Sequence, residues 1–324
     1  MIKKILKSIK RFGFAYTFFY VLQRFGLVKT MPVSLLLKKQ TYFKNLPLQA
    51  QIAEMQDFYK NETGKDLNMQ TPSAFSEKLQ WMKFYDSTKQ KADLSDKYLA
   101  PRIIKEKYGD KIQVVPQLGV WDNADDIDFS RLPQKFVLKC THGSAMNIIV
   151  KDKTRLNIKK TKKRLNDWLR LDYAYVMGMY ENHYSFISPK IIAEQYIQEV
   201  DGNLHDYKIH CFAGEPKYIQ LIGDRVPNSH QYYYAIYDAN WNKTSIQLKG
   251  RPLYQQNYPK PAQLGQMLAL AKDMSKDFLY VRVDFYILND QIYFGELTFT
   301  PDSGFLNFED DKVDQEWGCM IHLP

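Results

Sequence analysis

The alternation of hydrophobic and polar positions predicts helices first and strands later. Apolar residues recur at helical spacing near the N-terminus, whereas from residue 114 onward short runs rich in Val, Ile, Tyr and Phe favour strands. We expect helices at 48–59, 77–85, 91–108, 156–169 and 262–275. We expect strands at 114–121, 136–141, 146–150, 191–197, 207–212, 216–222, 232–237, 279–288 and 291–299. Pro101 should break or kink the third helix, because proline has no amide hydrogen to donate.

Tight turns join several of these strands. Asn289 and Asp290 close the last strand pair, and Ala213-Gly214-Glu215 closes an earlier one. A third hairpin is expected where the strand 136–141 is followed by 146–150. Helices first, a mixed region next and an antiparallel end together indicate an α+β fold.

The N-terminal arm combines helical periodicity with positive charge. Apolar residues from Ile2 to Phe12 alternate with lysines and an arginine, and the aromatic run that follows, ending at Leu22, is too short to span a bilayer. Such a helix can lie in the membrane interface on the cytoplasmic leaflet. It can also pack its aromatic residues, among them Phe18 and Phe19, on the body and leave its lysines in solvent. Both interpretations stay open.

The net charge of +9 belongs to this arm. Residues 1–53 hold ten Lys or Arg and no acidic residue, whereas residues 54–324 hold 35 basic and 36 acidic side chains. Nucleic-acid-binding proteins more often spread basic residues over a folded face, so the distribution argues against that class. The three cysteines form no CxxC pair, which favours a reducing, cytoplasmic compartment over disulfides or structural zinc.

Two carboxylates interrupt the aromatic strands of the last hairpin. Asp284 and Glu296 lie on adjacent antiparallel strands, and a buried carboxylate there has to be paired or bind a cation. Oxygen ligands of this kind suit Mg²⁺, which completes its coordination from nucleotide phosphates. Arg282 shares a face with Asp284 by strand alternation and would stabilise phosphate charge. Alternatively, Arg282 simply pairs with these acids as a structural bridge.

A second group of residues surrounds a loop of small side chains. Lys139 lies in a strand whose other residues are apolar, and Gly143 and Ser144 at the following tip would let backbone amides approach an anion. A phosphate-covering loop and a simple hairpin with an edge lysine are both compatible with this pattern. His142 would contact phosphate or substrate, although a solvent-facing position is the default for a loop histidine.

Further charged residues stand on or beside strands. Glu194 is followed by Gln195, Tyr196 and Ile197, and such a strand end offers a carboxylate and backbone groups to adenine and ribose. Two more cations, Lys208 and Arg225, lie on or after later strands. Charges at strand ends are usually solvated, so their order along the chain is more informative than any one of them.

That order resembles the ATP-grasp superfamily. More closely, six segments within residues 70–324 resemble the TupA-like ATP-grasp family, which is associated with teichuronopeptide and other bacterial surface polysaccharides: Phe75-Ser-Glu-Lys-Leu-Gln-Trp, Asp96-Lys-Tyr, Leu118-Gly-Val-Trp, Lys139-Cys-Thr-His-Gly-Ser, Asp206-Tyr-Lys and Phe294-Gly-Glu-Leu-Thr-Phe-Thr-Pro. The resemblance implies an ATP-grasp fold in which two α+β subdomains grip ATP, here with an N-terminal helical extension. It implies ATP and Mg²⁺ as cofactors.

The resemblance also assigns roles by position. Catalytic residues would be Arg282, Lys208 and Arg225. The nucleotide would be bound by Lys97, Lys139, His142, Gly143, Ser144, Glu194, Gln195, Tyr196 and Ile197. Asp284, Glu296 and Thr298 would bind the metal, with Thr298 standing where ATP-grasp ligases often have Asn. Ala145 stands where glycine is expected, which would stiffen the loop.

The implied reaction joins a carboxylate to an amine through an acyl phosphate. Its partners would be a polysaccharide or lipid-linked glycan and an amino acid, on the inner face of the plasma membrane if the arm contacts lipid. The expected divisions are 1–50 (basic arm), 51–112 (helical region), 113–200 (ATP-grasp lid) and 201–324 (C-terminal subdomain with the metal site). A glycosyltransferase using Asp126 and Asp128, or a non-catalytic scaffold, are the alternatives.

Overall fold

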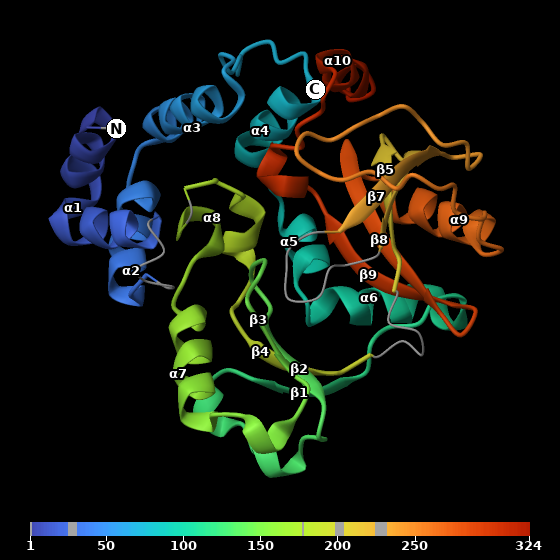
Figure 1. Cartoon of the computed structure of the whole chain (residues 1–324), viewed down its shortest axis with the longest axis horizontal. Coiled ribbons are helices and arrows are strands. Elements are labelled where there is room, and N and C mark those ends of the chain that lie inside the picture. Colours follow the sequence, from blue (N-terminus) through green and yellow to red (C-terminus); the bar gives the residue numbers. More distant parts are fainter. Residues whose placement is uncertain (1, 25–30, 177, 198–203, 224–231) are drawn as a thin grey trace.

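Two antiparallel sheets, each covered by helices, make up the body of the computed structural model, which describes residues 2–24, 31–176, 178–197, 204–223 and 232–324 (Figure 1). The helices of the described part are α1 (Ile2–Arg24), α2 (Val33–Lys44), α3 (Leu48–Thr63), α4 (Phe75–Tyr85), α5 (Lys89–Ser95), α6 (Leu99–Tyr108), α7 (Ile158–Leu169), α8 (Tyr173–Val176), α9 (Leu264–Ser275) and α10 (Asp311–Cys319). The strands are β1 (Gln117–Trp121), β2 (Phe136–Cys140), β3 (Asn147–Val150), β4 (Ile191–Gln195), β5 (Asp206–Phe212), β6 (Glu215–Gly223), β7 (Tyr233–Asp238), β8 (Tyr280–Leu288) and β9 (Gln291–Thr298).

The smaller sheet has the strand order β1-β4-β2-β3 and is covered by α7. Every second residue of β2 is buried, so Phe136, Leu138 and Cys140 pack against Leu165 of α7 while Lys139 points to the other face. β2 and β3 form the hairpin expected from the sequence. The alternation thereby leaves one face of this sheet free to present Lys139.

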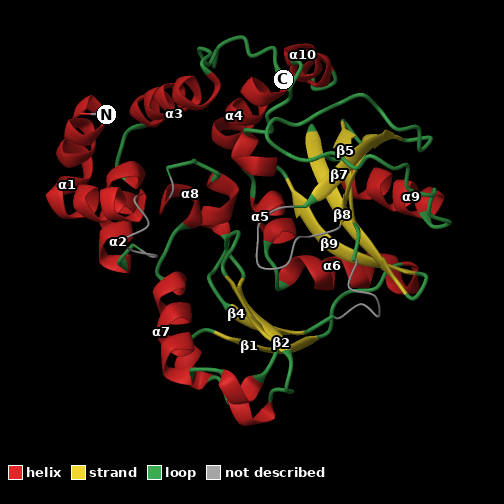
Figure 2. Cartoon of the chain, viewed as in Figure 1, coloured by secondary structure: helices red, strands yellow, loops and turns green. Residues whose placement is uncertain are grey.

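The larger sheet has the order β7-β6-β5-β8-β9 and packs against a hydrophobic cluster on each face, and Figure 2 shows α9 beside it. Val283 and Phe285 of β8 pack with α9 on one side, whereas Tyr280 packs with Phe75 of α4 and Trp317 of α10 on the other. Both two-residue turns of this sheet adopt left-handed backbone conformations. These are the ones at Ala213-Gly214 and at Asn289-Asp290, where the sequence predicted them.

The expected break at Pro101 is wrong in its place and cause. The chain leaves the helical path at Asp96–Tyr98, and Pro101 lies in the first turn of α6, where no helical hydrogen bond needs its nitrogen. The Asp96 carboxylate accepts a hydrogen bond of 2.7 Å from the Tyr98 amide and so stabilises the start of α6. The predicted strand 114–121 is also shorter than expected, because Gln113 bonds to β9 before β1 begins.

The N-terminal helices pack on the body. α2, which the sequence did not predict, places Val33, Leu36 and Leu37 against the core of the smaller sheet. α1 contacts α2, and the Arg11 guanidinium forms an ion pair of 2.5 Å with Glu54 of α3. Within the described ranges, no helix is both long and apolar enough to cross a bilayer.

Candidate functional site

Five predicted site residues meet on one face of the larger sheet. β8 lies between β5 and β9, so Asp284 stands opposite Lys208 on one side and Glu296 on the other. Arg282 donates two hydrogen bonds of 2.7 Å to Asp284. Its Nη2 also reaches Thr298 Oγ1 at 3.1 Å and Glu296 Oε1 at 3.4 Å. The predicted strand alternation therefore holds, and the guanidinium lies at the centre of three oxygen-bearing side chains.

Asp284 is ionised although it is buried. Burial alone would raise the pKa of its carboxyl, but Arg282 and then Lys208, whose ammonium forms an ion pair with it, outweigh burial and hold the pKa below its usual range. A buried carboxylate with two cationic partners satisfies the rule that internal charges are paired. Arg282 thus pairs with both acids, as the structural-bridge interpretation expects, and its role at phosphate stays a prediction.

Glu296 is not buried, contrary to the sequence argument. Its side chain is 52% exposed, because the ladder is irregular between Asp284 and Phe285, where Gly295 is inserted. A side chain at Gly295 would meet the carbonyl oxygen of Asp284 at 2.9 Å, so glycine permits the close approach of the two strands. The carboxylate of Asp284 is thus buried and paired with cations, whereas that of Glu296 is exposed.

On the smaller sheet, Lys139 forms an ion pair with Glu194 on the neighbouring strand β4. Glu194 is buried, whereas Lys139 keeps 28% of its side chain exposed. Gln195 is exposed and its amide donates to the Pro116 carbonyl at 3.0 Å. Tyr196 and Ile197 follow the end of β4 and are half-buried. Their predicted contact with adenine and ribose stays a prediction.

Lys97 connects the two groups. Its ammonium donates to the Gly143 carbonyl in the loop after β2. Burial lowers the pKa of Lys97, nearby Lys139 lowers it further, and Glu296 and Glu194 raise it. These neighbours belong to both sheets, so the predicted nucleotide residues and the predicted metal residues share one electrostatic environment. The arrangement could not be derived from sequence spacing, because Lys97 lies between α5 and α6.

The loop after β2 differs from expectation at His142. The histidine is buried, its Nε2 lies 3.2 Å from the Trp168 carbonyl, and burial lowers its pKa. The solvent-facing default is therefore wrong, and the imidazole lies beneath the loop. Ser144 and Ala145 are exposed at the tip. Ala145 has a φ of 58°, a left-handed conformation that glycine adopts without steric strain.

A buried polar network that the sequence analysis missed stands beside the site. The Glu181 carboxylate accepts a hydrogen bond of 2.9 Å from Ser303 and another from Thr300, both just after β9. Lys83, wholly buried on α4, donates to the Ser303 carbonyl at 2.6 Å. Burial raises the pKa of Tyr184 well above its usual range, and the charges of Glu181 and Glu296 add to that effect.

This network holds a strained turn. Asp302 and Ser303 have φ of 50° and 53°, and neither is glycine. Such residues cost about 1 kcal/mol or more each and persist where surrounding contacts impose them. A sequence signal did exist: Glu181 is an acidic residue in an aromatic segment, the same pattern that drew attention to Asp284.

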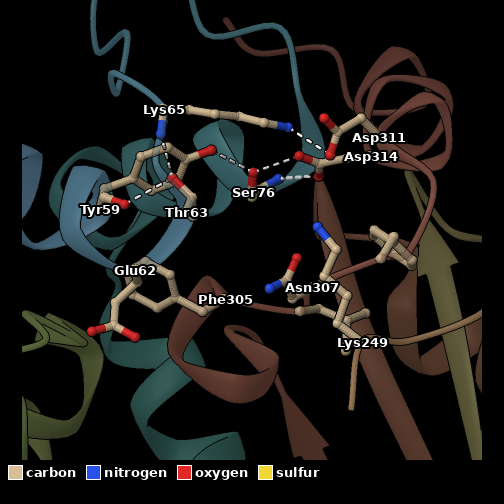
Figure 3. A pocket seen from close by; sticks show the side chains of 12 residues that line it. Tyr59, Glu62, Thr63, Lys65, Ser76, Lys249, Phe305, Asn307, Asp311 and Asp314 are labelled. Carbon is tan, nitrogen blue, oxygen red and sulfur yellow. Dashed lines mark hydrogen bonds and ion pairs between the residues drawn. The ribbon is translucent and has the colours of Figure 1, made fainter. Parts of the chain in front are cut away.

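A partly open pocket of about 110 Å³ lies away from these residues (Figure 3). Asp314 of α10 accepts hydrogen bonds of 2.9 and 2.7 Å from the amide and hydroxyl of Ser76, and Tyr59 lies 2.7 Å from the same hydroxyl. Lys65 and Asp311 form an ion pair of 2.7 Å across it. These contacts join α3, α4 and α10, and none of the predicted site residues lines the cavity.

The residues proposed for the alternative enzyme class serve as turn residues. Asp128 accepts a hydrogen bond of 3.0 Å from the Ser130 amide and begins a short 3₁₀ helix, while Asp126 ends another. Arg225 lies outside the described residues. Within the described ranges, no three His, Cys, Asp or Glu side chains come together as a metal-binding group.

Comparison with known families decides the class. A family model described as TupA-like ATPgrasp matches residues 77–322. The chain belongs to the TupA-like ATP-grasp family. Membership confirms the resemblance, the ATP-grasp fold and the assignment to ATP-dependent ligases, and it does not favour a glycosyltransferase. No curated protein sequence matches the chain.

Solved structures similar to this ATP-grasp protein include ligases. The D-alanine–D-alanine ligase from Helicobacter pylori is similar at 16% identity and a TM-score of 0.40, over 78% of this chain and 70% of that one. The ATP complex of the Bacillus anthracis enzyme is similar at 15% identity and a TM-score of 0.42, over 71% of this chain and 65% of that one. The D-cycloserine synthetase DcsG is similar at 14% identity and a TM-score of 0.38, over 71% of this chain and 70% of that one. This chain thus spans less than two thirds of the Bacillus anthracis enzyme. Similarity at this level says nothing about the substrates of the present protein.

Proposed function

We propose that this protein uses Mg²⁺ and ATP to join a carboxylate to an amine through an acyl phosphate. The observation that carries the proposal is the convergence of Lys208, Arg282, Asp284, Glu296 and Thr298 on one face of the larger sheet, with Lys97 connecting them to Lys139 and Glu194. Family membership supplies the ATP-dependent ligase class. The intermediate, the metal and the substrates are our own assignment.

The nucleotide would lie between the two sheets. Lys97, from the segment between α5 and α6, and Lys139, from β2, carry positive charge there. The backbone amides of Gly143 and Ser144 are suited to cover phosphate oxygens. Glu194, Gln195, Tyr196 and Ile197 would face adenine and ribose. His142, buried below the loop, would support its shape more than contact phosphate.

The donor set fits magnesium. Asp284, Glu296 and Thr298 offer oxygen atoms only, and Mg²⁺ usually takes one or two carboxylates and completes its coordination from phosphates. Glu296 is exposed and reaches Arg282 at 3.4 Å, so its carboxylate is the more available of the two. When bound, the ion would neutralise charge on the phosphates being transferred.

The chain's own cations would carry the rest of the chemistry. A carboxylate oxygen of the substrate attacks the γ-phosphorus, the bond to the β-phosphate oxygen breaks, and ADP leaves with that electron pair. Arg282 and Lys208 stabilise charge on the transferred group. The amine nitrogen then attacks the acyl carbon, phosphate leaves, and loss of a proton from nitrogen completes the amide. No protein nucleophile is needed.

We further propose that the carboxylate belongs to a bacterial surface polysaccharide or its lipid-linked precursor, and that an amino acid supplies the amine. The support for this is the family's association with surface polysaccharides, which the motif segments first suggested. A uronic acid is the chemical class of sugar that provides such a carboxylate.

Acyl phosphate trapping tests the proposal. The protein is incubated with Mg²⁺, ATP, a uronic acid or an oligosaccharide containing one, and hydroxylamine, and hydroxamate is measured by mass spectrometry. Hydroxamate formation that requires ATP and the acid supports the mechanism, as does amide formation when an amino acid replaces hydroxylamine. Release of UDP from a sugar nucleotide, without ADP formation on any acid–amine pair, would contradict it.

A further inference from the structure

The segment α1, which bends at Gly13, exposes large apolar side chains both before and after the bend. Phe14 is 71% exposed, which is the largest value among the exposed large hydrophobic residues of the described part, and Leu6 and Phe18 are 60% and 50% exposed. Phe14 and Phe18 lie one helical turn apart with their rings stacked at 6.2 Å. Single exposed apolar residues are ordinary, but a group of exposed apolar residues is typical of a surface that binds a membrane or another protein.

This exposure does not come from a detached helix. On the opposite side, Tyr16 and Thr17 are buried, and the ring of Phe12 lies 5.2 Å from that of Tyr42. Before the bend at Gly13, the 2.5 Å ion pair between Arg11 and Glu54 joins α1 to α3. α1 is thus anchored to the body on both sides of its bend at Gly13, while Phe14 and Phe18 project outward.

Positive charge accompanies the exposed apolar face. Lys10 is exposed one turn after Leu6 in the part of α1 before the bend at Gly13, and Lys38 is exposed on the neighbouring α2. The sequence of α1 contains further lysines and no acidic residue occurs before Glu54. Of the basic residues described here, Arg11 is already neutralised by Glu54, whereas Lys10 and Lys38 remain at the surface.

We propose that the exposed side chains of α1, Leu6 and Lys10 before the bend and Phe14 and Phe18 after it, dock on an anionic lipid bilayer. An interfacial helix inserts aromatic and aliphatic side chains to the depth of the headgroups while lysines remain at the anionic surface. A membrane presents negative charge uniformly, which suits a face with cations and no acidic residue between them. The inference concerns a different surface from the ATP site and does not depend on the ligase assignment.

Cosedimentation of the full-length protein with vesicles tests the docking surface. We expect binding to vesicles of phosphatidylcholine with about one third phosphatidylglycerol, and weaker binding to phosphatidylcholine alone or at high salt. Replacing both aromatic residues, Phe14→Ala with Phe18→Ala, should weaken binding to anionic vesicles about tenfold or more, because buried apolar area drives insertion. Lys10→Glu should weaken it and reduce its dependence on salt.

Ile149→Ala provides the matched control, since Ile149 is 56% exposed on β3. It should leave vesicle binding unchanged, and thermal unfolding of each variant verifies that the fold is retained. Equal binding to neutral and anionic vesicles, or unchanged binding after loss of both aromatic rings, would overturn the proposal. So would a lack of vesicle binding together with capture of an acidic protein by the same face.

Discussion

Arg282 holds Asp284 through two parallel hydrogen bonds of 2.7 Å, and both side chains are buried on β8. Such bidentate contacts between guanidinium and carboxylate are among the stronger polar interactions in proteins. Because Lys208 also pairs with this carboxylate, two cations surround one anion. The pairing contributes to stability, and Glu296, 3.4 Å from Arg282, balances the second positive charge.

Asp284→Asn should therefore destabilise the protein in a pH-dependent way. The folded-state pKa of Asp284 lies below its unfolded value of about 3.8, so its contribution to stability is present above that pH and is lost as the pH falls further. We expect a loss of about 3–5 kcal/mol at neutral pH, because the variant leaves buried cations unpaired. Urea unfolding measures the difference, which should stay constant from pH 7 to about pH 5 and shrink below about pH 4. A difference that does not shrink between about pH 4 and about pH 2.5 would contradict the assignment.

Ala145→Gly should stabilise the loop after β2. Ala145 has φ of 58°, where an alanine is strained and a glycine is not, so the free energy of unfolding should rise by about 0.5–1 kcal/mol. Ala262→Gly is the control: Ala262 is exposed and has no positive φ, so the same change there should lower stability slightly. A loss of stability in both variants would contradict the prediction that the backbone of Ala145 is strained.

Glu181 and Ser303 should be energetically coupled. Glu181→Gln removes an acceptor for the hydroxyls that hold the Pro301–Gly304 turn, and we expect a loss of about 1–3 kcal/mol with slower ADP formation. A double-mutant cycle with Ser303→Ala measures the coupling, which should be at least about 0.5 kcal/mol. Additive losses would show that the bond does not fix the turn.

Lys97→Met should weaken ATP binding about tenfold to a hundredfold, because it removes a charge that would face phosphate and whose partners lie on both sheets. Lys89→Met, at an exposed residue of α5 that pairs with Asp93, is the control and should bind ATP normally. Calorimetric titration with ATP and Mg²⁺ compares the two variants. Equal affinities would remove Lys97 from the nucleotide site.

The sequence predicted more of the larger sheet than of its surroundings. Strand alternation placed Arg282 and Asp284 on one face, and the Asn289-Asp290 turn closed the hairpin, because both features depend on residues close in the chain. The burial of Glu296 was predicted wrongly, since it depends on the irregular pairing next to Gly295. Local patterns fix a strand's faces but not the details of its pairing.

Long-range contacts could not be read from the chain. Glu181 meets Ser303 across 122 positions, and Lys97 meets Gly143 across 46, so no spacing rule connects them. His142 looked like a loop residue because its neighbours are small and polar, yet the end of α7 covers it. α2 was missed because its apolar face is completed only by the smaller sheet.

The most direct test of the ATP site is single-turnover ADP formation by Glu296→Gln beside Glu215→Gln. The two glutamates lie on the same sheet with side chains 52% and 51% exposed, but only Glu296 adjoins Arg282. With Mg²⁺, ATP, acid and amine present, the account predicts a loss of about a hundredfold or more for Glu296→Gln and wild-type rates for Glu215→Gln. Equal rates for both variants would contradict a catalytic site at the β8–β9 hairpin.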